Sequence, residues 1–240
     1  MLEIIQETGS TNAELIARIK AGERIPEGHW LVADRQTAGK GRLDRKWLGG
    51  PGNFMGSTLV HLGHGDPDPS TLALVAGLAA FEAAKRYLPE SAALHLKWPN
   101  DLIADGRKLA GILLERGGDA VVIGIGVNLA NAPSLEAGPT AAIADFGPAP
   151  ERDAFAEELA RQLDLELERW RSYGLGPIIR RWLDHAYETG TPLRVVEADG
   201  SRLDGTFAGL DEGGALQLRL ANGAMRAIHA GDVFLTGDDD

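Results

Sequence analysis

The sequence predicts an α+β protein, in which a mixed β-sheet with packed helices is followed by a small β-barrel. Helical and strand-like patterns alternate over most of the chain, whereas its last part holds short β runs separated by turn residues. The turn residues of that part are Asp199-Gly200, Glu212-Gly213-Gly214 and Asn222-Gly223. A length of 240 residues suits one large domain with a small appendage. We therefore expect a main domain at 1–188 and a five-stranded antiparallel barrel at 189–240.

The first elements follow from capping residues and from periodicity. Ser10 is a good helix N-cap, and the apolar spacing after it predicts a helix over 11–21 that stops at Gly22. β-rich runs predict strands at 30–34 and 53–61, on either side of a basic segment that contains glycines.

The middle of the chain predicts one buried helix and several strands. Ser70 should cap an Ala/Leu-rich helix that runs to about residue 88 and is apolar on all sides. A short strand is expected at 94–98, Asp105-Gly106 is a turn between two β stretches, and further strands are expected at 108–115 and 120–129. The last of these is almost continuously apolar, which is typical of a central strand.

Two helices are expected before the C-terminal β unit. The segment 151–173 is long and amphipathic, and acidic residues crowd its first part, where the helix dipole favours them. A second helix should run from about residue 177 to 187.

Residues 35–47 form a basic segment in an acidic chain. They carry five basic residues and one acid, whereas the whole chain has a net charge of −11. Glycines let backbone N–H groups approach a ligand closely, and neighbouring Arg and Lys supply charge for phosphate or carboxylate oxygens. We interpret the segment as an anion-binding loop whose expected anion is a nucleotide phosphate. The alternative is a solvated surface loop.

Composition argues against several classes of protein. Without cysteine, the chain can have no disulfide framework, zinc–thiolate site, iron–sulfur ligation or Cys nucleophile. We expect no signal peptide and no contact with a membrane, so a cytoplasmic location is the default. The acidic balance argues against nucleic-acid binding, which needs a broad basic face. The terminal Asp238-Asp239-Asp240 is expected to be a solvated end.

Three other segments carry polar residues or glycines that suggest a site. Gly9-Ser10-Thr11-Asn12 is most simply a helix cap. Lys97-Trp98-Pro99-Asn100-Asp101 either ends a strand, because Asn and Asp satisfy their own backbone in turns, or contributes to a site. Gly124 and Gly126 lie in an apolar strand and indicate close approach by a ligand or by another strand. The sequence has no P-loop motif, so the basic loop is the candidate for holding phosphates.

Taken together, the motifs are highly specific. In this order, G-x-G-R-x-x-R-x-W (39–47), K-W-P-N-D (97–101), K-L-A-G-I-L (108–113) and G-I-G-x-N (124–128) resemble the motifs of biotin protein ligases. The resemblance covers nearly the whole chain. It implies the class II synthetase-like fold of biotin and lipoate ligases, with an SH3-like C-terminal barrel. It also implies that biotin and MgATP give biotinyl-5′-AMP and pyrophosphate. Biotin then passes to one lysine of a biotin carboxyl carrier protein, such as that of acetyl-CoA carboxylase.

The resemblance also implies roles for individual residues. Lys108, Arg42 and Arg45 match the catalytic cations, which contact the biotin carboxylate and the phosphates. Residues that match the biotin site are Ser10, Thr11, Gln36, Gly39, Lys40, Gly111, Gly124 and Gly126. Residues that match the nucleotide site are Arg42, Arg45, Trp47, Asn100, Asp101, Lys108 and Asn128. Asp101 is also matched to the Mg²⁺ that the nucleotide carries. The basic loop is expected to close over the adenylate and exclude water.

One departure and two alternatives accompany the resemblance. Lys40 stands where the family often has Arg, a mild change if this position acts through its backbone N–H. Only nine residues precede Ser10, so the chain resembles the short ligases without an N-terminal DNA-binding domain. A lipoate or octanoate ligase of the same fold is the nearest alternative, although a fatty chain needs an apolar tunnel, whereas Ser10, Thr11 and Gln36 favour the ureido ring of biotin. A non-catalytic biotin sensor would not need the cations. A monomer and a sheet-edge homodimer both stay open.

Overall fold

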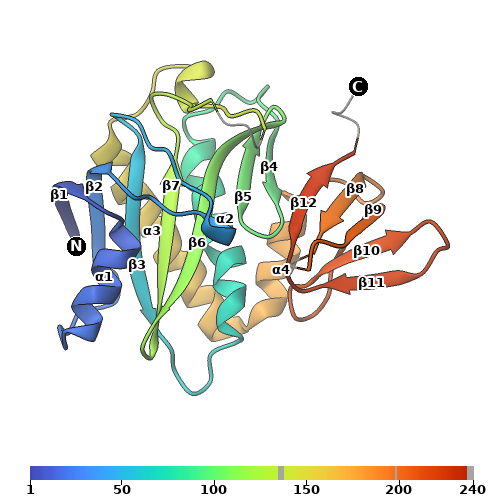
Figure 1. Ribbon diagram of the computed structural model, residues 1–240, viewed down its shortest axis with the longest axis horizontal. Helices are drawn as coiled ribbons and strands as arrows, with labels where there is room; N and C mark the ends of the chain where they lie inside the picture. Colours follow the sequence, from blue (N-terminus) through green and yellow to red (C-terminus); the bar gives the residue numbers. More distant parts are fainter. Residues whose placement is uncertain (135–137, 198, 237–240) are drawn as a thin grey trace.

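A computed structural model describes residues 1–134, 138–197 and 199–236, which form two β-sheets with helices packed on the larger one (Figure 1). The predicted fold class is confirmed, because a mixed sheet with helices precedes a small antiparallel sheet. Asp238-Asp239-Asp240, at the end of the expected 189–240 unit, lies outside the described residues.

The larger sheet has seven strands in the order β1-β2-β3-β7-β6-β5-β4. Their bounds are β1 Leu2–Thr8, β2 Trp30–Gln36, β3 Phe54–His61, β4 Leu94–Lys97, β5 Asp101–Ala104, β6 Arg107–Gly117 and β7 Ala120–Val127. β1 is parallel to β2, whereas the other neighbouring pairs are antiparallel. The sequence did not predict β1, because an edge strand is half exposed and its polar residues hide the strand pattern.

Helices cover the two faces of this sheet unequally. Their bounds are α1 Thr11–Lys20, α2 Leu72–Lys85, α3 Arg152–Tyr173 and α4 Leu175–Leu183. α2 and α3 lie on one face, over the main hydrophobic core, whereas the short α1 lies on the other (Figure 1). Under α1, a second, smaller core forms around Leu15, Leu31 and Leu59. One part of the α1 face is therefore free to hold a site. None of the described helices is long and apolar enough to span a bilayer.

The smaller sheet contains the five antiparallel strands that the sequence predicts. They are β8 Pro192–Val196, β9 Arg202–Leu210, β10 Leu216–Leu220, β11 Met225–Ile228 and β12 Asp232–Leu235, in the order β11-β10-β9-β8-β12. The predicted turns join them, and Gly200, Gly214 and Gly223 have φ values of 83°, 82° and 83°. Such values are strained for other residues, so these glycines are required by the turns.

Some expected element bounds are wrong. The helix predicted from Ser70 to about residue 88 is α2, which begins at Leu72 and ends at Lys85. Asp68, not Ser70, caps the turn before α2, since its carboxylate accepts the backbone N–H of Ser70 at 2.8 Å. α4 spans Leu175–Leu183 rather than 177–187. The strand predicted at 120–129 ends at Val127, where the chain leaves the sheet.

Trp98 links the two sheets, and its indole Nε1 donates to the carbonyl of Gly214 at 3.1 Å. We expect Trp98→Phe to lose this hydrogen bond and to lower the free energy of unfolding by about 1 kcal/mol. The Tm should then fall by about 2–4 °C, which differential scanning calorimetry can measure. Tyr173→Phe, at a side chain that is 73% exposed, is the control and should leave the Tm unchanged. An unchanged Tm for Trp98→Phe would contradict the link.

Candidate active site

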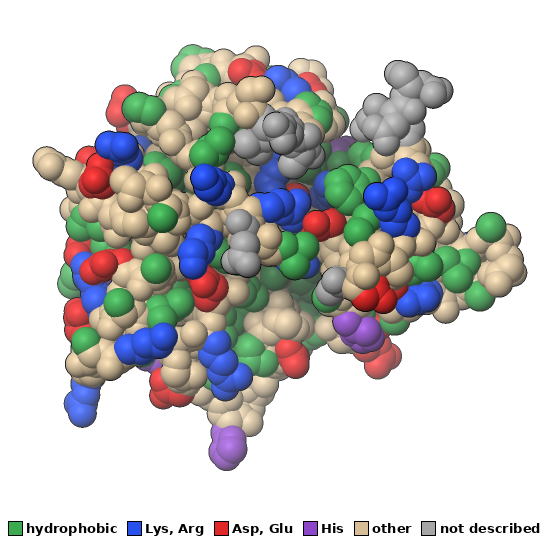
Figure 2. All heavy atoms as spheres, viewed as in Figure 1, with side chains coloured by type: hydrophobic (Ala, Val, Ile, Leu, Met, Phe, Trp, Pro, Cys, Tyr) green, Lys and Arg blue, Asp and Glu red, His purple; other side chains and the backbone are tan. Residues whose placement is uncertain are grey.

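A pocket of about 640 Å³ opens between the α1 face of the larger sheet and β12 of the smaller one. Lys and Arg side chains gather around the hollow between the larger sheet and the C-terminal strands (Figure 2). Most residues that the motifs predict for the site line this pocket. These are Ser10, Thr11, Gln36, Lys40, Arg42, Arg45, Trp47, Asn100, Asp101, Lys108, Gly111, Gly124 and Gly126. Gly39 and Asn128 are not part of the lining.

Polar side chains at the start of α1 and at the end of β2 line part of the pocket, and a buried serine of β3 lies behind them. Ser10 caps α1 as predicted, with its hydroxyl 3.5 Å from the N–H of Ala13. Gln36 ends β2, and its Oε1 accepts the backbone N–H of Thr11 at 2.8 Å. Ser57, which the sequence did not predict for the site, lies on β3 with its Oγ 2.6 Å from Thr11 Oγ1. The helix cap is therefore also part of a polar wall.

The basic loop is a tight turn that folds back on itself. A β-bridge pairs Lys40 with Lys46, and Gly41 N–H donates to the carbonyl of Arg45 at 2.7 Å. Leu43 lies at the tip with a φ of 52°. Because the loop returns so sharply, it places Arg42 and Arg45 together beside the pocket.

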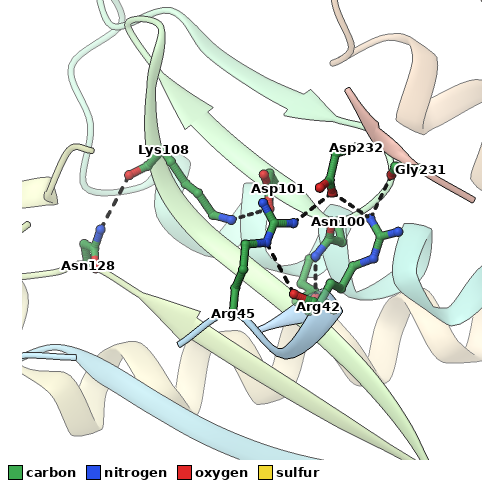
Figure 3. A network of polar contacts seen from close by, with 9 residues as sticks. Arg42, Arg45, Asn100, Asp101, Lys108, Asn128, Gly231 and Asp232 are labelled. Atoms are coloured by element: carbon green, nitrogen blue, oxygen red, sulfur yellow. Dashed lines mark hydrogen bonds and ion pairs between the residues drawn. The ribbon is translucent and has the colours of Figure 1, made fainter. Parts of the chain in front are cut away.

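Both loop arginines contact the smaller sheet (Figure 3). Arg45 donates to the Asp232 carboxylate at 2.8 Å, and Arg42 donates to the carbonyl of Gly231 at 3.2 Å. Arg42 also donates to Asn100 Oδ1 at 3.3 Å. Burial lowers the pKa of Arg42, while Asp232 and Asp101 oppose that shift. Protein oxygens therefore occupy the guanidinium groups that an anionic ligand would use.

Two pocket lysines lie within the electrostatic influence of Asp101, and one of them is paired with it. Lys108, on β6, has its Nζ 2.6 Å from Asp101 Oδ1, at the start of β5 (Figure 3). Lys97, at the end of β4, has its Nζ 5.7 Å from the centre of the Phe234 ring. Burial lowers the pKa of Lys97, while Asp101 opposes the shift. The loop arginines and these lysines thus concentrate positive charge in the pocket. A bound phosphate can replace the protein oxygens that Arg42, Arg45 and Lys108 contact.

Lys97 and Asp232 are two residues of the pocket lining that the sequence did not predict. Lys97 stands in a motif that was recognised, so its position was a usable signal. Asp232 had no comparable signal, because only the fold brings β12 to the basic loop.

Asn128 and the pocket glycines mainly serve other protein groups. Asn128 donates to the carbonyls of Ala141 at 3.0 Å and Lys108 at 3.5 Å, which fixes the backbone that carries Lys108. A Cβ on Gly126 would lie 2.2 Å from the Trp47 ring, and a Cβ on Gly124 would lie 2.4 Å from Asn12 Oδ1. These glycines make room for neighbouring side chains, and their contact with a ligand stays a prediction.

Comparisons with known proteins agree with the motifs. The profile described as "Biotin/lipoate A/B protein ligase family" matches residues 10–128, and "Biotin protein ligase C terminal domain" matches residues 194–236. The biotin–[acetyl-CoA-carboxylase] ligase of Paracoccus denitrificans is 35% identical over 98% of this chain and 100% of its own length. The chain belongs to the biotin protein ligase family. The resemblance noted from the sequence is therefore confirmed.

Two further biotin protein ligases are similar to this chain, one in sequence and one in fold. The biotin–[acetyl-CoA-carboxylase] ligase of Mycobacterium tuberculosis is 34% identical over 97% of this chain and 88% of its own length. The biotin protein ligase of Aquifex aeolicus, solved in complex with biotin and ATP, superimposes with a TM-score of 0.85 at 24% identity. That similarity covers 98% of this chain and 99% of the solved chain, and it shows that the fold is shared.

Proposed function

We propose that this chain is an AMP-forming ligase that activates biotin with MgATP to biotinyl-5′-AMP and releases pyrophosphate. It then transfers biotin to one lysine of a biotin carboxyl carrier protein, such as that of acetyl-CoA carboxylase. The relatives named as such ligases align over essentially the full chain, which supports this reaction. One structural observation carries the proposal: a polar wall of the buried Thr11 and the half-buried Gln36 shares a pocket with the cations Arg42, Arg45 and Lys108.

The first step brings two anions together, because the biotin carboxylate must attack the α-phosphorus of ATP. A carboxylate oxygen bonds to phosphorus while the bond to the pyrophosphate oxygen breaks. We assign Arg42, Arg45 and Lys108 to neutralising the carboxylate and the phosphates, because fixed charge stabilises the developing charge of such a transition state. Lys108 is suited to this task, since Asn128 holds its backbone.

The second step needs no nucleophile from this chain. The neutral amine of the carrier lysine attacks the acyl carbon of the adenylate, AMP leaves, and an amide forms with loss of a proton. Until then the mixed anhydride must be kept from water. The position of the basic loop beside the pocket supports a covering role.

We assign the remaining pocket residues by position. The biotin ring is assigned to the polar wall of Ser10, Thr11 and Gln36 and to the nearby Gly39, Lys40, Gly111, Gly124 and Gly126. The nucleotide is assigned to Trp47, Asn100, Asp101 and Asn128 together with the cations. Gly39 and Asn128 would act from behind the pocket lining.

Asp101 is the residue that would hold Mg²⁺. Among the described residues, no group of three or more His, Asp or Glu side chains could bind a metal ion on its own. A single carboxylate fits Mg²⁺ that arrives on a nucleotide, because such ions are held by one or two carboxylates and by substrate phosphates. The ion would supply further positive charge to the phosphates. Lys108 Nζ lies 2.6 Å from the same carboxylate and would compete with Mg²⁺ for it.

We propose that residues 1–188 carry the biotin and nucleotide sites, and that residues 189–240 form a second domain that completes the pocket. The Asp232 contact with Arg45 supports this division of labour. We also propose that the protein works in the cytoplasm, where ATP and carboxylases are found together.

A pyrophosphate-release assay tests the function directly. Purified protein is given MgATP with biotin, lipoate or octanoate, with and without an apo carrier domain. We expect release with biotin and transfer of biotin to one carrier lysine. Release with lipoate or octanoate alone would favour the alternative acyl ligases of the same fold. Biotin binding without release from any acid would favour a sensor.

We expect Arg42→Gly to leak biotinyl-5′-AMP, because the loop would lose its contacts with Asn100 and Gly231. Free adenylate in the reaction can be measured by mass spectrometry, and it should rise relative to the wild type. Arg116→Gly, at an exposed side chain on β6, is the control. If free adenylate does not rise in the Arg42 variant, the loop does not seal the site.

A further inference from the structure

A chain of polar side chains joins three residues of the pocket lining, Gln36, Thr11 and Asn12, through the buried Ser57 behind them. Thr11, Asn12 and Ser57 are 3%, 3% and 0% exposed. The chain joins Gln36, Thr11, Ser57, Asn12 and Glu115 in this order, through contacts of 3.2, 2.6, 2.6 and 2.8 Å. Because each group has a fixed inventory of donors and acceptors, the direction of the hydrogen bonds can be worked out.

The direction is set at Asn12. Its amide Nδ2 lies 2.8 Å from Glu115 Oε2 and 3.4 Å from the carbonyl of Leu113, and both partners accept only. The amide nitrogen must therefore face these oxygens, and Asn12 Oδ1 faces Ser57 at 2.6 Å. Since Oδ1 can only accept, the single hydroxyl proton of Ser57 is directed to Asn12.

Ser57 then fixes the proton of Thr11. Having donated to Asn12, the Ser57 hydroxyl can only accept from Thr11 Oγ1 at 2.6 Å. The alternative acceptor, Gln36 Oε1, is farther away at 3.2 Å and already receives the Thr11 backbone N–H at 2.8 Å. Thr11 therefore has lone pairs left for a ligand, while the Gln36 amide nitrogen is left to donate.

We propose that Ser57 and Asn12 are positioning residues that hold the Thr11 hydroxyl as an acceptor for a ureido N–H. This inference rests on the proposed biotin ligase function and names what selects the acid. A dithiolane or an alkyl chain has no N–H to offer, so the lone pairs of Thr11 would be buried unpaired. Gly124 leaves the space that Asn12 needs for this position, because a Cβ there would lie 2.4 Å from Asn12 Oδ1.

The test compares biotin with its two cyclic carbamate analogues, in which a ring oxygen replaces one ureido N–H. The readout is kcat/KM for pyrophosphate release with each acid. In the wild type, the carbamate that faces Thr11 should be used roughly 100-fold less well than biotin, because two acceptors then oppose each other. Ser57→Ala frees the Thr11 proton, so this discrimination should shrink about tenfold while the KM for ATP stays unchanged.

The matched control is Thr58→Val, at the next residue of β3. Thr58 is 2% exposed, and its hydroxyl donates to the carbonyl of His29 at 2.7 Å on the other face of the sheet. It should keep the wild-type discrimination. Asn12→Ala is a second variant and should reduce discrimination as Ser57→Ala does, because it removes the acceptor that directs Ser57.

The outcomes separate this inference from the proposed function. If the wild type releases no pyrophosphate with biotin, the function itself is wrong. If it uses biotin but both Ser57→Ala and Asn12→Ala keep the full discrimination, the positioning role is wrong. Equal use of biotin and both carbamates by the wild type would also overturn it.

Discussion

Replacing Lys108 by Ala should lower kcat for biotin-dependent pyrophosphate release by about 10²–10³-fold, the usual effect of removing one preorganised group that stabilises transition-state charge. The KM for biotin should change far less, because the polar wall remains intact. The fall in kcat has a second cause. In the free variant the Asp101 carboxylate would lack the ammonium group of Lys108, which lies 2.6 Å away in the wild type. Steady-state kinetics with saturating MgATP gives both parameters.

Lys20→Met is the matched control for this variant. Lys20 is exposed at the end of α1 and lies outside the pocket lining, so kcat should stay at the wild-type value. A Lys108 variant that keeps kcat but raises the KM for biotin would show that Lys108 only binds substrate. Unchanged kinetics would remove Lys108 from the catalytic machinery.

Gly126→Ala should weaken binding of biotin and of a non-hydrolysable ATP analogue by about 100-fold while the protein stays folded. The added Cβ would lie 2.2 Å from the Trp47 ring, which is far too close for carbon atoms. The central strand β7 is paired on both sides and cannot yield, so the ring and the basic loop must move. Calorimetric titration measures the affinities, and circular dichroism follows the fold.

Gly176→Ala in α4 provides the comparison, because its Cβ would meet only the end of the Arg180 side chain at 3.7 Å. This variant should bind both ligands normally. Wild-type affinity in Gly126→Ala would mean that Trp47 can move without consequence. Loss of the fold would instead mean that the ring position is part of the core.

Short-range patterns predicted most of the fold. The helix cap at Ser10, the apolar strand β7 and the glycine turns of the smaller sheet each depend on a few neighbouring residues. The β1 strand could not be found this way, because its partner β2 begins more than twenty residues later and its exposed edge keeps it polar. Asp68 and Ser70 are both good caps, and only the folded turn distinguishes them.

The site was predictable where the residues that form it also form motifs. Arg42, Arg45 and Lys108 stand in recognisable segments, and the fold brings them to one pocket. Asp232 and Ser57 stand in ordinary strands, so their importance appears only when distant elements meet. The sequence correctly predicted a close approach at the pocket glycines Gly124 and Gly126. The groups that approach them are the side chains of Asn12 and Trp47 of the same chain.

The contact between the basic loop and β12 suggests a use in protein engineering. A cut between the exposed Glu188 and Thr189 divides the chain into two fragments that meet at the pocket, through Arg45 on one and Asp232 on the other. Fused to two interacting proteins, the fragments would form a split enzyme whose activity depends on their reunion. Biotin would then be attached only where the two fusion partners meet, so the split enzyme would report their proximity.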